Sequence, residues 1–238
     1  MEKRAPWYLA PLLAVVLQGS ATGEQAPVIE AITFALAPGE VYVPVEEARK
    51  ALDWKATRDA KGQLTKLNGT AVPRGALRSL IDGGELIRIA HLEQAGAPVM
   101  RDPSGKTANV GSATRYFTAV VSPKRAEVNL ATQRLRAWQG ERLVLESRVS
   151  SGRRGSTPAG DFRAGPYKAR RHYSSRYNNA PMPWSVQVNG HIFIHGFTSV
   201  PKYPASHGCI RLPLNEGNPA RFFYEWIDKG TPIRIIRK

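Results

Sequence analysis

Hydrophobic and polar positions alternate along much of the C-terminal half of the chain. Between residues 116 and 150, four runs carry apolar side chains at every second position or short β-branched stretches bounded by turn residues. This pattern is typical of strands, and it predicts four of them: YFTAVV, AEVNLAT, RLRAW and RLVLESRVS. A further strand pair is predicted within residues 184–196, because Asn189-Gly190 favours a tight hairpin turn.

The end of the chain predicts one helix and one strand. Asn218 and Pro219 are typical of a helix start, and Gly230 is typical of a helix end. The strand covers the run PIRII. Within the helix one apolar stripe predicts a buried face rather than a ligand site; it consists of Phe222, Phe223, Trp226 and Ile227.

Residues 38–97 show a different pattern, which mixes strands with short helices. Residues 41–45 alternate as in a strand, and residues 48–52 place apolar side chains at helical spacing. Asn68-Gly69 predicts a hairpin turn. Residues 77–96 predict two helices separated by a Gly-Gly break, the second of them ending at Gly96.

The stretch GEVYVPVEEARKALDW resembles the small repeat module at the N-terminus of copper amine oxidases, which also occurs in many bacterial envelope proteins. The resemblance implies a spacer or wall-binding module and no copper chemistry. His91 stands alone in this region, and a single histidine is more typical of a core or surface position than of a metal site.

The first 23 residues are typical of a secretory signal peptide. A start with two basic residues precedes the apolar run Trp7–Leu17 and a small, polar segment. This run is too short to cross a bilayer core of about 30 Å as a helix. We predict cleavage near Gly23, with an uncleaved anchor as the alternative. The mature protein is therefore expected to be exported to the periplasm or cell wall, with membrane contact only through the uncleaved signal peptide.

These patterns divide the chain into five predicted segments. A signal peptide (1–23) and a linker (24–37) precede the small α+β module (38–97). A linker rich in Pro, Gly, Ser and Thr (98–115) leads to a mainly β domain (116–238). The fold class expected for the whole chain is mainly β with minor α.

The composition adds a strong positive charge. The chain carries 34 Lys and Arg against 19 Asp and Glu, a formal net charge of +15. Such a balance favours polyanions as partners. No helix-turn-helix pattern, zinc ligand set or aromatic RNA-binding motif is present in the sequence, so no nucleic-acid partner is expected. Anionic wall polymers or an anionic membrane surface fit an exported protein better, and a solvated surface without a dedicated partner is the alternative.

Cys209 is the only cysteine of the chain, so it cannot form an intrachain disulfide. A leftover thiol in an exported protein is either inert or reactive. A reactive thiol needs a base nearby, and His195 and His207 lie close in sequence. The amides of Gly208 and Cys209 could stabilise an oxyanion, and the forked guanidinium of Arg211 suits a carboxylate. The alternative is a buried cysteine in a tight turn.

The motifs IFIHGF and SHGCIRLP, with SGRRGSTPAGDF upstream, resemble the L,D-transpeptidase catalytic domain (YkuD-type). The resemblance covers residues 116–236 and implies a β-sandwich. It also implies roles for the motif residues. Cys209 would be the nucleophile, and His195 the general base, oriented by the carbonyl of Gly196. His207 would support the cysteine loop, with Gly208 and Cys209 as oxyanion donors, Ser206 as a turn residue and Arg211 binding substrate or bracing the pocket.

The implied chemistry is acyl transfer in peptidoglycan stem peptides, with no metal or organic cofactor. Cys209 would attack the third residue of a tetrapeptide stem, D-alanine would leave, and a thioester would remain for an amine to attack. An L,D-carboxypeptidase that uses water and a non-catalytic cell-wall-binding protein are the alternatives that remain open.

The stretch RAGPYKARRHYSSRYNNAPMPW is long for a connection and rich in Arg and Tyr. Long loops in compact domains are often lids or binding loops. We predict that Tyr173, Tyr177 and Trp184 line the donor groove and that Arg170 and Arg171 meet acidic stems. An ordinary exposed loop is the alternative.

Overall fold

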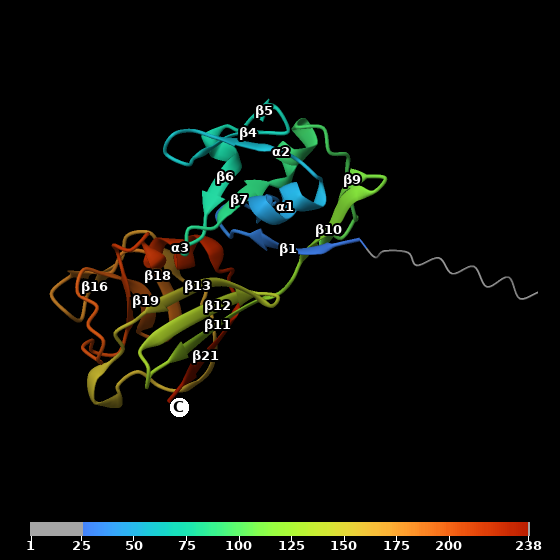
Figure 1. Cartoon of the computed structure of the whole chain (residues 1–238). Helices are drawn as coiled ribbons and strands as arrows, with labels where there is room; N and C mark the ends of the chain where they lie inside the picture. The colour runs from blue at the N-terminus through green and yellow to red at the C-terminus, as the bar shows by residue number, and fades with distance from the viewer. Residues whose placement is uncertain (1–25, 238) are drawn as a thin grey trace, which may run out of the picture.

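The computed structural model describes residues 26–237, so the predicted signal peptide lies outside the described residues. Two β-rich parts lie side by side, and helix α3 (Pro219–Trp226) lies where they meet (Figure 1). Across residues 26–237 no helix has the length and apolar character needed to cross a membrane. The mainly β fold class predicted from the sequence is confirmed.

The first part, called here the N-terminal module, covers residues 26–122 and is built on a seven-stranded sheet. Two short helices directly follow strands of this sheet. The module also contains a separate three-stranded sheet with the order β3-β4-β5. The order across the large sheet is β6-β7-β2-β1-β10-β9-β8. The elements are β1 (Val28–Thr33), β2 (Val41–Pro44), α1 (Val45–Ala51), β3 (Ala56–Arg58), β4 (Leu64–Leu67), β5 (Thr70–Ala71), a 3-10 turn (Arg74–Ala76), β6 (Leu77–Ser79), β7 (Glu85–Arg88), α2 (Ile89–Gln94), β8 (Val99–Arg101), β9 (Thr107–Ser112) and β10 (Arg115–Val121).

Several expectations for this module were wrong in detail. Both predicted linkers contain strands, β1 in the first and β8 and β9 in the second. In the first case the reason is pairing, because β1 joins β2 antiparallel and β10 parallel and so lies inside the sheet. Residues 77–96 form β6, β7 and only one helix. On β7 the neighbouring side chains of Leu86 and Ile87 enter two different hydrophobic cores, as expected for a strand buried on both faces. The hairpin at Asn68-Gly69 and the strand–helix passage of residues 41–51 are confirmed.

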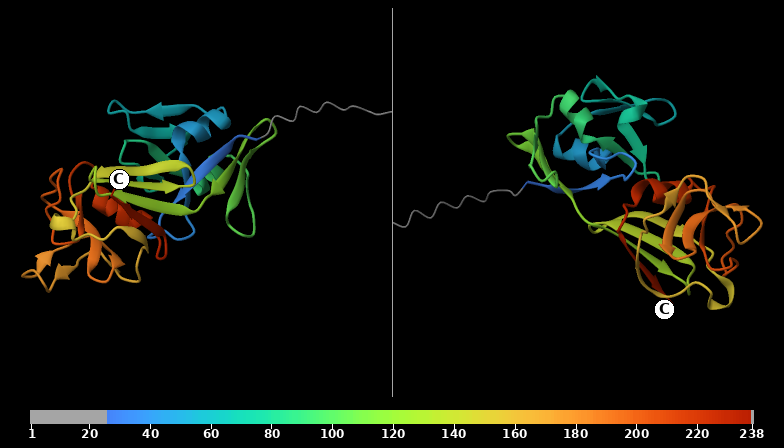
Figure 2. Two further views of the ribbon diagram at one scale, coloured as in Figure 1. Left: turned by 90° about the horizontal axis from the view of Figure 1, so that it is seen from below. Right: turned by 180° about the vertical axis from the view of Figure 1, so that it is seen from behind.

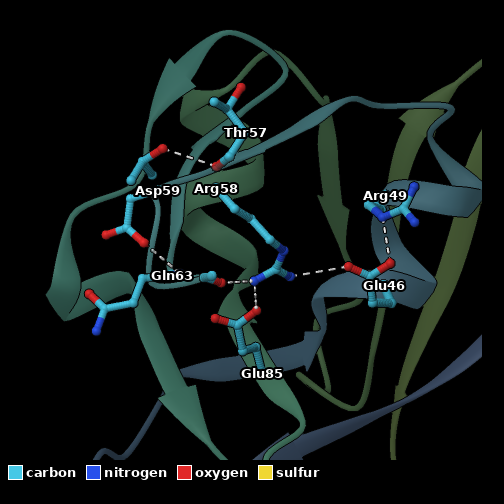
Figure 3. Close-up of polar contacts among 9 residues, drawn as sticks. Glu46, Arg49, Thr57, Arg58, Asp59, Gln63 and Glu85 are labelled. Carbon is cyan, nitrogen blue, oxygen red and sulfur yellow. Dashed lines mark hydrogen bonds and ion pairs between the residues drawn. The ribbon is translucent and has the colours of Figure 1, made fainter.

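An ionic cluster joins the small sheet to the rest of the module (Figure 3). Arg58, the last residue of β3, lies 2.6 Å from a Glu85 oxygen on β7 and 3.3 Å from a Glu46 oxygen on α1. Its guanidinium also donates to the carbonyl of Gly62 at 2.8 Å. The hydrogen bond to Glu85 is the largest of the effects that raise the pKa of Arg58. One side chain therefore connects three elements of the module.

The second part, called here the C-terminal domain, covers residues 123–237 and contains two main sheets that pack around α3 (Figure 2). A five-stranded sheet has the order β13-β12-β11-β21-β14, a four-stranded sheet has the order β15-β18-β19-β20, and a hairpin pairs β16 with β17. The strands predicted by the period of two all form, but the first of them, YFTAVV, is β10 of the N-terminal module. The predicted domain start at residue 116 is therefore wrong, because β10 pairs with β1 and β9 in the module's sheet. The elements are β11 (Lys124–Asn129), β12 (Arg134–Gln139), β13 (Arg142–Arg148), a 3-10 turn (Arg153–Gly155), β14 (Gly160–Arg163), β15 (Lys168–Ala169), β16 (Tyr173–Ser174), β17 (Ala180–Pro181), β18 (Ser185–Asn189), β19 (Ile192–Phe197), β20 (Ile210–Pro213) and β21 (Pro232–Ile236).

Helix α3 begins as predicted and ends earlier than predicted. The Asn218 side chain accepts a hydrogen bond from the Arg221 amide at 3.0 Å, and Pro219 fills the first helical position. The last helical residue is Trp226, and a turn separates it from Gly230. The predicted stripe of Phe222, Phe223, Trp226 and Ile227 is buried, as expected.

The N-terminal module and the C-terminal domain share one hydrophobic core over α3. Phe34 of the module packs edge-on against Phe222 of α3, with ring centroids 5.7 Å apart. Arg78 pairs with Glu225 at 3.1 Å. Further along the interface, the Arg142 guanidinium donates to both oxygens of Glu47 at 2.9 and 2.7 Å. Since apolar packing and a two-pronged ion pair both cross the boundary, the module is fixed to the domain rather than tethered by a loose linker.

Candidate active site

Two parallel strands bring the predicted chemical groups together. β19 carries His195 and β20 begins immediately after Cys209, and the strands pair in register with Ile194 opposite Ile210 and His195 opposite Arg211. His195, Cys209 and Arg211 line a cavity of about 770 Å³, whereas Ile194 and Ile210 are buried in the core. Every lining residue comes from the segment 167–211, so the cavity belongs to the C-terminal domain alone.

The Cys209 thiol lines this cavity and is partly accessible to solvent. Its sulfur lies 3.6 Å from the carbonyl oxygen of His191. Burial raises the pKa of the thiol, and a hydrogen bond with the Phe193 backbone and the charge of Arg211 partly offset this rise. At neutral pH the resting group is therefore a protonated thiol.

The His195 imidazole is buried, with 3% of its surface exposed. Its Nδ1 lies 2.9 Å from the carbonyl oxygen of Gly196, so Nδ1 carries the proton and Nε2 is left as the acceptor. Burial lowers the pKa of His195 to about 4, the Gly196 hydrogen bond opposes this, and the positive charge of Arg211 adds to it. The ring is therefore neutral at pH 7 and able to accept a proton.

Both pKa shifts disfavour a resting thiolate–imidazolium pair. Burial disfavours the charged form of both groups, which favours a neutral thiol and a neutral imidazole in the same cavity.

Gly196 also fixes the position of His195 through close packing. A Cβ at Gly196 would lie 2.4 Å from a Leu214 methyl and 3.1 Å from the Ala220 Cβ on α3. Only glycine allows the helix to approach β19 this closely. The helix that carries the shared core therefore lies directly against the residue that orients the histidine.

The loop before Cys209 is held by hydroxyl groups. The Ser206 hydroxyl donates to the Cys209 carbonyl at 2.5 Å and accepts from the Gly208 amide at 3.0 Å. The Thr157 hydroxyl donates to the Gly208 carbonyl at 2.6 Å and accepts from the Gly152 amide at 2.7 Å. Ser206 is thus a loop-bonding residue, in line with its expected turn role.

Gly208 differs from its predicted role in two respects. Its amide already donates to Ser206, so it does not point freely at an oxyanion. Its φ of +146° favours glycine, and a Cβ would lie 2.9 Å from a methyl of Ile192. The backbone conformation and the close contact with Ile192 therefore require glycine here.

His207 lines the cavity and is exposed, and two contacts hold its ring. It stacks on Tyr177, with centroids 4.3 Å apart and planes 14° apart. A guanidinium nitrogen of Arg153 donates to its Nε2, which sets the tautomer. These contacts fit the supporting role expected for His207, and they bring the charge of Arg153 to the cysteine loop.

The predicted loop residues divide into two groups. Tyr173 and Tyr177 line the cavity and are exposed. Trp184 does not line it, because its ring packs against Tyr224 of α3 and beneath Arg170, whose guanidinium lies 5.1 Å from the ring centroid. Arg170 and Arg171 are likewise outside the cavity lining. The structure therefore corrects the predicted positions of Trp184, Arg170 and Arg171.

Sequence reasoning missed several lining residues. Arg176 lies in the loop next to Tyr177, and His172 hydrogen-bonds to Tyr167 at 3.1 Å. Phe193 and Phe197 lie two residues before and after His195 along β19. The period of two therefore predicts that their side chains share one face of the strand with His195. Nothing local in the sequence indicates that Arg176 rather than Arg171 would face the cavity.

The fold and the cavity define a mainly β domain with a cysteine–histidine pocket at the end of two parallel strands. Residues 123–235 match the YkuD family model, described as the L,D-transpeptidase catalytic domain. The family resemblance of the C-terminal domain is thereby confirmed. The match leaves the N-terminal module unassigned, including its resemblance to the copper amine oxidase repeat. No curated protein matches the chain.

Several solved structures are similar to the chain. An L,D-transpeptidase from Stackebrandtia nassauensis is 23% identical over 49% of this chain and 57% of its own, with a TM-score of 0.43. One from Xylanimonas cellulosilytica is 27% identical over 61% and 67%, with a TM-score of 0.41. One from Mycobacterium smegmatis is 17% identical over 88% and 94%, with a TM-score of 0.43. The chain thus spans just over half the length of the Stackebrandtia protein.

Proposed function

We propose that the protein is a peptidoglycan L,D-transpeptidase that works through a cysteine thioester. One observation carries the proposal: Cys209 and His195 open into a single cavity within the segment that matches the family model. The proposed steps are supported by the tautomer of His195 and by the general chemistry of acyl transfer.

In the first half-reaction the thiol proton of Cys209 passes to Nε2 of His195 as the sulfur attacks the carbonyl carbon of the third stem residue. The tetrahedral intermediate collapses, the carbon–nitrogen bond to D-alanine breaks, and His195 returns the proton to the leaving amine. A thioester to Cys209 remains. The backbone amide of Cys209 is the donor proposed for the oxyanion.

In the second half-reaction an amine of another stem attacks the thioester. The amine loses a proton to His195, the carbon–sulfur bond breaks, and the sulfur takes the proton back as the thiol. The product is a cross-link between two stems. Water in place of the amine would give an L,D-carboxypeptidase. The proposed location of this chemistry is the periplasm or cell wall.

The deciding experiment is incubation of the mature protein with a disaccharide-tetrapeptide, followed by mass spectrometry. A cross-linked dimer together with released D-alanine supports the transpeptidase, and a trimmed tripeptide alone identifies the hydrolase. Cys209→Ser is the matched control and should give neither product. An untouched substrate, with Cys209 still open to alkylation by iodoacetamide, would reject both enzymatic activities.

The alternative of a non-catalytic wall-binding protein predicts that the behaviour of the protein does not depend on Cys209. It expects sedimentation with purified cell walls that is unchanged in Cys209→Ser and no acyl adduct on the thiol. For the N-terminal module we propose a wall-binding or spacing role. The shared core with the C-terminal domain favours a fixed arrangement for such a role over a flexible tether.

A further inference from the structure

The segment that builds the cavity is free of acidic side chains. Between Asp161 and Glu216 the chain contains no Asp or Glu and seven Lys or Arg. All lining residues lie within this segment, among them Arg176, Arg211 and four of the five histidines. The cavity therefore offers positive charge and hydrogen-bond donors, and its lining contains no carboxylate to neutralise them.

Arg211 is the charged group nearest to the cysteine along the chain. Its side chain is half-buried, and its guanidinium lies over the Phe197 ring at 4.0 Å from the centroid. Within residues 26–237 no acidic side chain lies within ion-pair distance of it. Burial and the nearby Arg153 both disfavour its charge and lower its pKa. An arginine held this way gains most from an anion that enters the cavity.

Arg153 adds to the same positive field, because its charge acts on Arg211 and its contacts reach the cysteine loop. Its amide donates to the Ser206 carbonyl at 3.0 Å, and its guanidinium donates to His207. Within the described residues it has no acidic partner either, in contrast to Arg148, which pairs with Glu216 at 2.7 Å. Two guanidinium groups thus flank the thiol loop without a counter-ion.

We propose that this cavity selects donor stems whose carboxyl groups are free over stems in which the same groups are amidated, with Arg211 as the carboxylate-binding residue. The proposal rests on the proposed function for the nature of the substrate. Its physical reason is that a carboxylate accepts charge-assisted hydrogen bonds from a guanidinium, whereas a carboxamide brings no charge and adds N–H donors to a cavity already rich in donors.

Measuring the binding affinity of a stem peptide tests this inference independently of catalytic turnover. Calorimetry would compare two synthetic tetrapeptide stems, free and amidated, binding to Cys209→Ala, which cannot form a thioester. We expect the free stem to bind about 10- to 100-fold more tightly. The ratio should fall towards one in Arg211→Gln and recover in part in Arg211→Lys. Raising the salt concentration should also reduce it.

Arg163→Gln is the matched control, because Arg163 lies in the same acid-free segment and outside the cavity lining. It removes one charge and should leave the ratio unchanged. Thermal unfolding of each variant excludes misfolding as the cause. Equal affinity for the two stems, no binding of either, or a ratio that survives Arg211→Gln would overturn the inference. Preferential binding of the free stem without any turnover by the wild type would reject the proposed function and leave this inference standing.

Discussion

The N-terminal module and the C-terminal domain differ most in how they balance charge. Residues 26–122 carry 12 Lys and Arg against 10 Asp and Glu, whereas residues 123–237 carry 19 against 7. In the module, basic side chains such as Arg58 and Arg88 pair with acids of neighbouring elements. In the domain, Arg176 and Arg211 line the cavity, and among residues 26–237 neither has an acidic partner within ion-pair distance. Among the described residues, many basic side chains are thus paired in the module, whereas the two arginines that line the cavity are not, and their charge can attract an anionic ligand.

The same contrast applies to the two buried histidines. His91 of the module and His195 of the domain are 4% and 3% exposed. Neither ring nitrogen of His91 has a hydrogen-bond partner, and His91 packs in the core of the module. His195 is oriented by Gly196 and lines the cavity. Burial alone therefore does not distinguish a core histidine from a candidate base; the difference lies in the oriented ring and the open cavity.

Replacing His195 by Gln tests this contrast with the largest expected effect. Loss of the base should lower the rate of D-alanine release from a tetrapeptide by about 10²- to 10⁴-fold, since proton transfer is coupled to attack. His91→Gln is the matched control and should leave the rate within about threefold of wild type while changing the midpoint of urea unfolding. Equal losses in the two variants would mean that His195 acts only through stability.

Phe34→Ala tests whether the two parts truly share a core. Phe34 is 3% exposed and packs on Tyr42 and Phe222. Truncating a buried phenylalanine costs about 3–5 kcal/mol of unfolding free energy. Hydrogen exchange should show the loss in α3 and in the module together. Leu36→Ala, at a neighbouring side chain that is 54% exposed, should cost less than about 0.5 kcal/mol. Loss of protection in the module alone would contradict a shared core.

Acid pH should destabilise the protein through His195. Its pKa is about 4 in the folded protein, below the ordinary value of about 6.5, so the unfolded chain binds the proton more readily. Stability is then fully present above pH 6.5 and falls as the pH drops from 6.5 to 4, by up to about 3 kcal/mol from this group. Urea unfolding of wild type and His195→Gln at pH 7 and pH 4 would measure the loss of unfolding free energy that is due to His195. An identical pH dependence in both would contradict the buried, neutral ring.

The sequence allowed the β-rich domain to be predicted well, because the period of two is a local signal. The same holds for the start of α3, where Asn218 and Pro219 act within one turn. Residues 77–79 were predicted to be helical and form β6, because pairing with β7 outweighs local helical spacing. The motif around Cys209 indicated the family, and pairing of β19 with β20 brings His195 and Cys209 to one cavity, which is a long-range feature of the fold.

The sequence does not show which side chains of the long loop line the cavity and which lie outside it. Arg170 was predicted to meet substrate, and the structure places it over Trp184 near α3. Arg176 was overlooked and lines the cavity. Both belong to one Arg- and Tyr-rich run, so composition treats them alike. What separates them is the β16–β17 hairpin, whose residues 173–181 turn back over the pocket. Such a distinction depends on tertiary packing and not on residue type.

The smallest effect is expected from the ionic cluster around Arg58. Arg58 is partly exposed and pairs with Glu85 and Glu46, so Arg58→Gln should lower the unfolding free energy by no more than about 1 kcal/mol. The difference from wild type should shrink at high salt, where paired surface charges are screened. Arg74→Gln, at an exposed arginine outside this cluster, is the control for simple loss of one charge.

Turnover of a tetrapeptide should stay unchanged in both variants, because the ion pairs of Arg58 connect elements of the module and do not reach the cavity. A fall in turnover with Arg58→Gln alone would show that charge balance in the module reaches the active site, and the division between a structural and a ligand-binding half would no longer hold.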